Sequence, residues 1–247
     1  MKFKTIQASA FRATFEVLKD ILNDVNIYFS STGMRIVTLD TARAALVDVN
    51  MPADNFEEYD CDRDIYAGVN ITNMFKLLKT ISNSDILVVS INSLEFMDIH
   101  IENSQKNTNT TFKLKLLDID EERIQIPDIN TTVITTIPSS DFQRICRDMN
   151  NLATEVHIIR KNDKMSIRCE GDFANQNTEI HCNDEKIEVC LQGVYSLKYL
   201  NLFTKATGMC AILQIMQEMN NQFMVLKYNI ANLGELRFYL ASKIEDI

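Results

Sequence analysis

Four segments of this chain resemble one another, and their spacing constrains the fold more than any other feature of the sequence. Each opens with Ser or Thr, residues that cap a helix by accepting a backbone N–H, and apolar residues then recur at helical spacing, most clearly in the first three. The segments are SAFRATFEVLKDILN from Ser9, TNMFKLLKTIS from Thr72, SDFQRICRDMNNL from Ser140 and SLKYLNLFTKAT from Ser196. We therefore predict four amphipathic helices that begin at these Ser and Thr residues.

Each predicted helix carries two basic residues spaced three or seven positions apart, which places them on one helix face. The pairs are Arg12 and Lys19, Lys76 and Lys79, Arg144 and Arg147, and Lys198 and Lys205. The four segments hold eight basic and four acidic residues, whereas the whole chain has a net charge of −9. Ordinary solvated helices also carry charged faces. Positive charge gathered on four equivalent elements of an acidic chain, however, favours a surface that attracts a polyanion locally.

The segment Leu116–Thr132, which reads LLDIDEERIQIPDINTT, has no helical period and lies between the second and third helices. Acidic residues crowd its front half, and Pro127 favours an extended backbone at the residue before it. The stretches on either side, 1–115 and 133–247, are equally long. We predict two similar domains, 1–115 and 133–247, joined by an extended connector over 116–132, and an internal duplication behind them.

Between the predicted helices the sequence alternates or runs apolar over short stretches that are typical of strands. The predicted strands are Val25–Ser30, Met34–Leu39, Ala44–Met51, Phe56–Cys61, Ile86–Ile91, Glu95–Glu102, Thr110–Leu117, Thr132–Thr136, Glu155–Arg160, Lys164–Glu170, Asn175–Asn183, Lys186–Leu191, Ala211–Met216, Phe223–Ala231 and Glu235–Ala241. Turns are expected at Gly33, Asn162, 184–185 and 220–221. The predicted fold class is α+β, with sheets dominating and the helices on one face.

The sequence supplies no constellation that indicates catalysis. The Gly-rich nucleotide-binding patterns are absent, the three His residues are far apart, and no Ser/His/Asp or Cys/His set can be specified. The stretch Asp60–Asp64 imitates the start of a calcium loop but lacks its Gly and its final Glu. The six cysteines show no zinc spacing and are expected to be free thiols in a reducing compartment. We expect a binding or scaffold protein with no metal, no cofactor, no secretory signal and no membrane span.

Five stretches, in order along nearly the whole chain, resemble proliferating cell nuclear antigen, the eukaryotic and archaeal DNA sliding clamp. They are CDRDIYAGVNITNMFKLLK (61–79), LKLLDIDEERIQIP (114–127), DFQRICRDM (141–149), SLKYLNLFTKAT (196–207) and KYNIANLGELRFYLASKIED (227–246). The resemblance implies a homotrimeric ring in which each subunit has two similar domains, with outer antiparallel sheets and two helices per domain on the inner face. Twelve helices would then surround duplex DNA.

The resemblance also assigns roles to residues. Arg12, Lys19, Lys76, Lys79, Arg144, Arg147, Lys198 and Lys205 match the family's DNA-facing positions, which hold the phosphate backbone weakly and without sequence preference. Residues 116–132 match the interdomain connector loop, which borders a pocket for short peptides of DNA polymerase, the clamp loader, flap endonuclease and ligase. The matching pocket residues are Leu39, Arg43, Ala44, Leu46, Ile124, Ile126, Pro127, Phe223, Tyr239, Ala241 and Ser242.

The pocket departs from the family pattern at several positions. Family members often have Pro where this chain has Ser242, Pro near Phe223, an aromatic residue near Thr131 and a His-Val type pair at Arg43 and Ala44. We therefore expect a pocket at the same place with a different shape and peptide preference. The subunit interface is expected to pair edge strands head to tail, at about Thr110–Leu116 and Gln176–Cys182.

Three functions are compatible with the sequence to different degrees. The resemblance implies a sliding clamp that serves as the processivity factor for DNA polymerase and as a docking platform for replication and repair proteins. A subunit of a heteromeric checkpoint-type clamp, or a monomeric viral processivity factor, is the alternative, and a metal-dependent nuclease would need ligands that the sequence does not supply. The expected location is the nucleus in a eukaryotic cell, and a cytoplasmic replication factory or the host nucleus for a viral protein.

Overall fold

The computed structural model describes residues 1–103, 105–120, 124, 126, 132–182, 187–218 and 223–243. The chain divides into two compact units. The first comprises Met1–Thr41, Val47–Gln125 and Asn229–Leu236, and the second comprises Ala42–Leu46, Ile126–Tyr228 and Arg237–Ile247. Two short segments, 42–46 and 229–236, thus belong to the unit opposite to the rest of their half of the chain.

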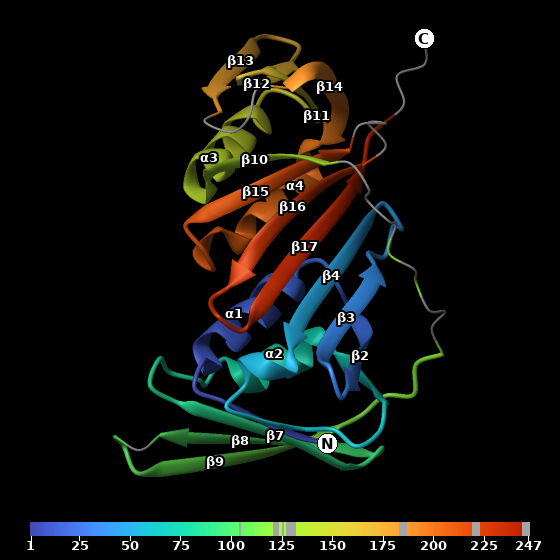
Figure 1. Ribbon diagram of the computed structural model, residues 1–247, viewed down its shortest axis with the longest axis vertical. Helices are drawn as coiled ribbons and strands as arrows, with labels where there is room; N and C mark the ends of the chain where they lie inside the picture. Colours follow the sequence, from blue (N-terminus) through green and yellow to red (C-terminus); the bar gives the residue numbers. More distant parts are fainter. Residues whose placement is uncertain are drawn as a thin grey trace. The chain divides into compact units, whose positions relative to one another are not determined.

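The first unit contains two helices in its described part, and its strands form two sheets (Figure 1). Its elements are β1 (Lys2–Thr5), α1 (Ala8–Leu18), β2 (Asp24–Ser30), β3 (Gly33–Leu39), most of β4 (Ala45–Pro52), the 3-10 turn η1 (Ala53–Asn55), β5 (Glu58–Asp60), β6 (Ile65–Asn70), α2 (Ile71–Leu78), β7 (Ile86–Ser93), β8 (Phe96–Asn103) and β9 (Thr108–Lys115). One sheet has the order β5-β1-β7-β8-β9, and the other runs β6-β2-β3-β4. Neighbours such as β1 and β7, or β8 and β9, pair antiparallel.

The second unit repeats this plan. Its elements are β10 (Thr132–Pro138), α3 (Ser139–Met149), β11 (Glu155–Asn162), β12 (Lys164–Glu170), β13 (Asn175–His181), β14 (Ile187–Ser196), α4 (Leu197–Phe203), the 3-10 turn η2 (Thr204–Gly208), β15 (Ile212–Glu218), and most of β16 (Phe223–Ile230) and β17 (Gly234–Ala241). One sheet has the order β13-β12-β11-β14, and the other runs β10-β15-β16-β17. Antiparallel sheets with few helices confirm the predicted α+β class.

Each unit has its own aromatic core. In the first unit Phe3 of β1 contacts Phe11 of α1, Phe29 of β2 and Phe56, with ring centroids 4.9–6.4 Å apart. In the second unit the rings of Phe203 and Phe238 stack at 4.4 Å, and Tyr228 meets Phe238 edge-on at 6.2 Å. These side chains are buried. Successive strand residues face opposite sides of a sheet, so the aromatic side chains form the apolar core against one side of it.

The predicted helices exist, but their caps differ from the prediction. The helices begin at Ala8, Ile71, Ser139 and Leu197, so only Ser196 stands at the predicted cap position, and it makes no capping bond through its side chain. The strands β6, β10 and β14 run directly into α2, α3 and α4, so the residue before each of these helices is a strand residue. In the first unit Asn70, the last residue of β6, caps α2 by accepting the N–H of Asn73 at 2.9 Å.

Every predicted strand overlaps an observed one, and the prediction differs from the structure at three other points. The strands β1 and β6 were not predicted, and β14 continues five residues past the predicted end at Leu191. The turn residues behave as expected at Gly33 (φ 138°) and Asn162 (φ 54°), where a left-handed backbone closes a hairpin. The turns expected at 184–185 and 220–221 lie outside the described residues.

Candidate functional site

In the first unit, α1 and α2 pack against each other, and Arg12 takes part in that packing. Its guanidinium Nη1 donates a 2.7 Å hydrogen bond to the carbonyl oxygen of Ile81, just beyond the end of α2. Arg12 is half-buried as a result. One of the eight predicted DNA-facing cations therefore already has a partner within the protein.

Lys19 is also held within the first unit. Its Nζ lies 3.1 Å from Asp20 Oδ1 and 5.3 Å from the centre of the Phe75 ring, a cation–π contact between α1 and α2. Its side chain keeps only 27% of its exposure. Lys76 on α2 and Lys79, the residue that follows α2, are exposed, and Lys76 Nζ donates to Asn73 Oδ1 at 3.2 Å.

In the second unit the four predicted cations are all exposed. Arg144 and Arg147 on α3 keep 59% and 70% of their side-chain exposure and approach Asp141 and Asp148 only at 3.7 Å. Lys198 lies on α4, and Lys205 lies on η2. Exposed ion pairs of this length are worth little in water, so these groups can exchange their carboxylate partners for another anion at small cost.

Neutral side chains join the helices of the second unit. Gln143 Nε2 donates to the carbonyl of Thr204 at 2.9 Å, and Asn201 Nδ2 donates to the carbonyl of Cys146 at 3.2 Å. Sequence reasoning missed Gln143, although its place after Phe142 repeats that of Arg12 after Phe11. These two bonds between the helical segments of the second unit come from uncharged amide side chains.

The predicted peptide-pocket residues divide between the units. In the second unit two of them, Leu46 and Tyr239, are buried, and two more, Ile126 and Phe223, are half-buried. The exposed ones are Arg43, Ala44 and Ala241. The backbone of Arg43 lies in the left-handed region, with φ 56°. Leu39 and Ile124 belong to the first unit and are half-buried. Pro127 lies outside the described residues. The grouping of these residues into one pocket remains a prediction.

Ser242, one of the predicted pocket residues, makes hydrogen bonds within the second unit. Its hydroxyl accepts the N–H of Val194 at 3.1 Å and donates to the carbonyl of Lys243 at 3.3 Å. Lys243 also pairs with Val194 as an isolated bridge, and its Nζ forms an ion pair with Glu155. Proline has no hydroxyl, so the hydrogen bond from the Val194 N–H requires Ser242, whereas the two contacts of Lys243 do not.

Two strands end their sheets at the places predicted for subunit contact. β9 is the last strand of its sheet in the first unit, and β13 is the last strand of its sheet in the second, with no described strand on the outer side of either. β9 presents Phe112 and Leu114, both half-buried. Phe173, 79% exposed in the turn before β13, is the most exposed large apolar side chain in the described part of the chain. No periodic pattern marks Phe173 in the sequence because it lies in a turn.

The described residues provide little for catalysis. No group of three or more His, Cys, Asp or Glu among them could hold a metal ion. Burial raises the pKa of the Cys61 and Cys146 thiols, which keeps them protonated and poorly nucleophilic. Within the same residues, no helix is long and apolar enough to cross a membrane.

Comparisons with known proteins cover almost the whole chain. Residues 1–123 match the family model "Proliferating cell nuclear antigen, N-terminal domain", and residues 125–243 match "Proliferating cell nuclear antigen, C-terminal domain". A relative from Paramecium bursaria Chlorella virus 1, named "Probable DNA polymerase sliding clamp 1", is 36% identical over 249 aligned positions, which cover 96% of this chain and 95% of the relative.

Proposed function

Because this chain belongs to the proliferating cell nuclear antigen family, we propose that it is a DNA sliding clamp, a processivity factor that tethers DNA polymerase to duplex DNA. The observation that carries the proposal is the repeated helix pair with its cations. Exposed Lys and Arg side chains gather on α2, α3, α4 and η2 of a chain whose net charge is −9. Such a surface attracts phosphates only where those elements lie.

The clamp is a ring of three identical chains. β9 and β13 each end a sheet, and one subunit's β9 can add to the next subunit's β13 in a head-to-tail contact that closes after three copies. Phe112 and Leu114 on β9, and Phe173 beside β13, supply the apolar area for such a contact. An exposed edge strand otherwise risks uncontrolled pairing, and ring closure removes that risk.

The ring holds DNA by topology, and its contacts with DNA are weak. Lysine and arginine side chains at the phosphate backbone read no base edges, so binding is independent of sequence. The exposed cations can move from one phosphate group to the next, as counterions do, and this lets the ring slide along the duplex. A closed ring then leaves only over a DNA end or by opening.

Partner proteins dock through short peptides at the connector and the C-terminal region. The proposed pocket is formed by the residues matched to the family, and its partners are DNA polymerase, the clamp loader, flap endonuclease and ligase. Ser242 in place of Pro, and its bond to Val194, support a changed peptide preference. A labelled family-type peptide that shows no saturable binding at high micromolar concentration would contradict the pocket assignment.

The chain itself needs no catalytic step and no cofactor for this role. Its place of action is where the DNA is replicated: the nucleus of a eukaryotic host, or a cytoplasmic factory or the host nucleus for a virus. Localisation of a tagged chain during DNA synthesis tests that part of the proposal.

Solution mass and DNA retention test the ring directly. Light scattering after gel filtration should give about 85 kDa, three times the 28.3 kDa of one chain, and the value should persist on tenfold dilution. Rings threaded onto linear duplex whose ends are then blocked should survive high salt and be released when the DNA is cut. A 28.3 kDa species that stimulates polymerase would instead indicate a monomeric factor, and a chain that assembles only with other clamp subunits would indicate a heteromeric clamp.

A further inference from the structure

Two tyrosines form an exposed aromatic pair on one sheet face of the first unit. Tyr66 of β6 and Tyr28 of β2 are direct cross-strand partners, and their ring centroids lie 4.8 Å apart at an angle of 36°. Tyr66 remains 45% exposed. The alternate residues of β2, Ile27 and Phe29, are buried, so the tyrosines project from the opposite face of the sheet.

A carboxylate completes this aromatic pair. The Tyr28 hydroxyl donates a 2.6 Å hydrogen bond to Asp64 Oδ2, and this bond raises the pKa of Tyr28. Asp64 is exposed, and it forms no ion pair with any residue that the structure describes. The hydrogen bond fixes the Tyr28 ring, which in turn supports the exposed ring of Tyr66. The pair is therefore preorganised beside an exposed carboxylate.

Further exposed carboxylates lie on β2, just before β6 and on the segment after β9. The segment after β9 crosses next to the aromatic pair, because Asn26 Nδ2 donates to the carbonyl of Ile119 at 3.0 Å and the Ile119 side chain reaches Gly68. Asn26 and Gly68 lie two residues from Tyr28 and Tyr66 on the same strands. The exposed acidic residues in these segments are Asp24, Asp60, Asp62, Asp64, Asp118 and Asp120.

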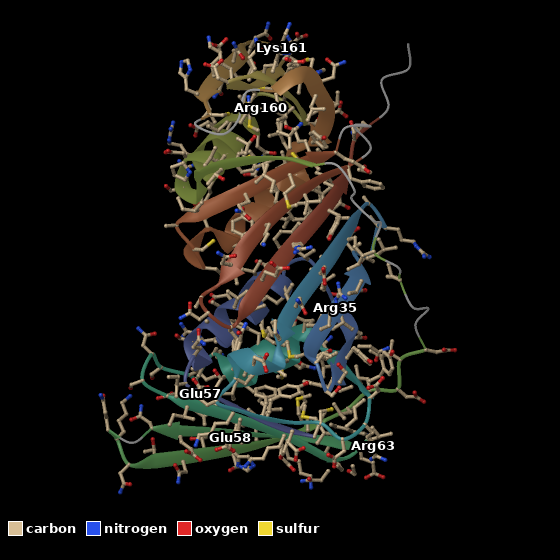
Figure 2. The ribbon with its side chains drawn as sticks, in the orientation of Figure 1. Arg35, Glu57, Glu58, Arg63, Arg160 and Lys161 are labelled. Carbon is tan, nitrogen blue, oxygen red and sulfur yellow. The ribbon has the colours of Figure 1, made fainter. Side chains whose placement is uncertain are left out.

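Positive charge on this face is scarce. Arg35 of β3, the cross-strand partner of Tyr28, is bound to the buried carboxylate of Asp48 through Nε and Nη2 at 3.0 and 3.2 Å. Arg63, next to Asp64 in the sequence, is the other arginine of these segments, and it is exposed, so this one exposed cation stands against six exposed aspartates; Figure 2 labels both arginines. Nucleic acid and anionic lipid would be repelled by such a surface, whereas a cation gains from both the rings and the carboxylates.

We propose that Tyr28, Tyr66 and Asp64 form a docking site for an arginine-bearing basic peptide of a partner protein. A guanidinium group is planar, can stack on the exposed face of Tyr66 and can donate to Asp64 at the same time. The exposed aspartates of these segments attract the remaining basic residues of the peptide and raise its rate of encounter. This site is independent of the basic helices and of the proposed ring.

The test is a titration of the full-length chain with a nine-residue oligoarginine peptide. The peptide carries a fluorescent label, so its anisotropy reports binding in the same way for the original chain and for variants that lack Tyr66. Tyr66→Ala should weaken binding by roughly two- to fivefold, the range expected for one cation–π contact at an exposed site, while Tyr66→Phe should retain it. Asp64→Asn should weaken binding more than Asp54→Asn, which removes one charge from an exposed position in the same unit.

Two outcomes would overturn the proposal. Equal weakening by Asp64→Asn and Asp54→Asn, together with no effect of Tyr66→Ala, would show attraction by net charge alone. Binding of spermine as tightly as the peptide in 0.15 M salt would lead to the same conclusion. The mass and DNA retention of Tyr66→Ala should match the unsubstituted chain, so failure of this site and failure of the clamp function are distinguishable.

Discussion

The two helix pairs repeat one plan but are held together by different chemistry. In the first unit the charged Arg12 donates to the carbonyl of Ile81 beyond α2, and in the second unit the neutral Gln143 donates to the carbonyl of Thr204 beyond α4. Both donors follow the Phe of a Ser-x-Phe motif near the start of the first helix of their pair. Arg12 therefore corresponds to Gln143 in the repeat. The guanidinium group of Arg12 makes a hydrogen bond within the first unit, to the carbonyl of Ile81.

This difference changes how much positive charge each unit can offer to DNA. Lys19 is also occupied in the first unit, by Asp20 and the Phe75 ring, whereas Arg144 and Arg147 of the second unit remain exposed. A count of basic residues treats the units as equal. Their contacts indicate that the second unit carries the larger share of exchangeable charge.

The largest loss of stability is expected when a buried aromatic ring is removed from the core of one unit. Phe203→Ala removes a fully buried ring that stacks on Phe238 at 4.4 Å, and should cost about 3–5 kcal/mol of the second unit's free energy of unfolding. Phe11→Ala is the matched change in the first unit, where Phe3 and Phe15 line the same core. Hydrogen exchange resolved along the chain should show each loss confined to its own unit. Equal loss of protection in both units would show that they unfold as one.

Alkaline pH should weaken the second unit through its buried tyrosines. Burial raises the pKa of Tyr195 to about 12, above its ordinary value of 10, and burial raises the pKa of Tyr228 as well. The folded state keeps these protons where the unfolded state releases them, so stability is full below pH 10 and falls as pH rises toward 12. The loss for Tyr195 is on the order of 2–3 kcal/mol. Urea unfolding between pH 9 and 12 measures it.

Tyr195→Phe supplies the control for the pH dependence. Phe has no titratable proton, so the substituted chain should lose less stability between pH 10 and pH 12 than the original. An unchanged slope would show that Tyr195 does not carry the effect. Burial also raises the pKa of Tyr59 in the first unit, so that unit should lose stability over the same pH range, and Tyr195→Phe isolates the share that comes from Tyr195 in the second unit.

Arg12→Ala tests whether the hydrogen bond of this arginine stabilises the first unit. It leaves the carbonyl of Ile81 without its donor, and a hydrogen bond from a charged group to a partly buried acceptor is worth roughly 1.5–3 kcal/mol. Arg12→Gln introduces the residue type that Gln143 supplies in the second unit, and it should recover part of this lost stability. Urea midpoints of the two variants decide the matter. If Arg12→Gln proves as unstable as Arg12→Ala while DNA retention falls in both, the charge itself matters.

Sequence patterns predicted the elements better than they predicted the role of each side chain. Helical spacing and turn residues located all four helices and most hairpins, because those signals are local. β6 was missed since Gly68 weakens its strand pattern, yet a Cβ there would lie 2.2 Å from the carbonyl oxygen of Leu117. That packing requirement comes from a residue 49 positions away and leaves no trace in local periodicity.

The candidate site shows the same limit. The eight cations could be found from spacing and from family resemblance, but the bond between Arg12 and Ile81 joins residues 69 positions apart. The helix face of Arg12 was predictable, whereas its partner was not. The prediction of the helix caps failed for a related reason. Asn70 is the last residue of β6 and also caps α2, so its capping role does not follow from the helical pattern.

The smallest expected effect compares single cations in DNA binding. Arg147→Gln removes an exposed cation, and should reduce the slope of log K against log salt by about 0.9 for each phosphate that the side chain neutralises. Lys19→Gln should reduce the slope by less, because Lys19 must first leave Asp20 and the Phe75 ring to reach a phosphate. The measurement is equilibrium binding to duplex DNA with open ends, followed from about 50 to about 200 mM salt.

Both substitutions remove one charge, so net charge alone predicts equal slopes for them. A larger change for Arg147→Gln supports the view that the first unit uses part of its charge to join its helices. Equal changes would show that DNA competes successfully for Lys19, and the contrast between the units would then apply to stability alone. Arg144→Gln on the same helix face as Arg147 should follow Arg147→Gln, since both arginines are exposed and only loosely paired.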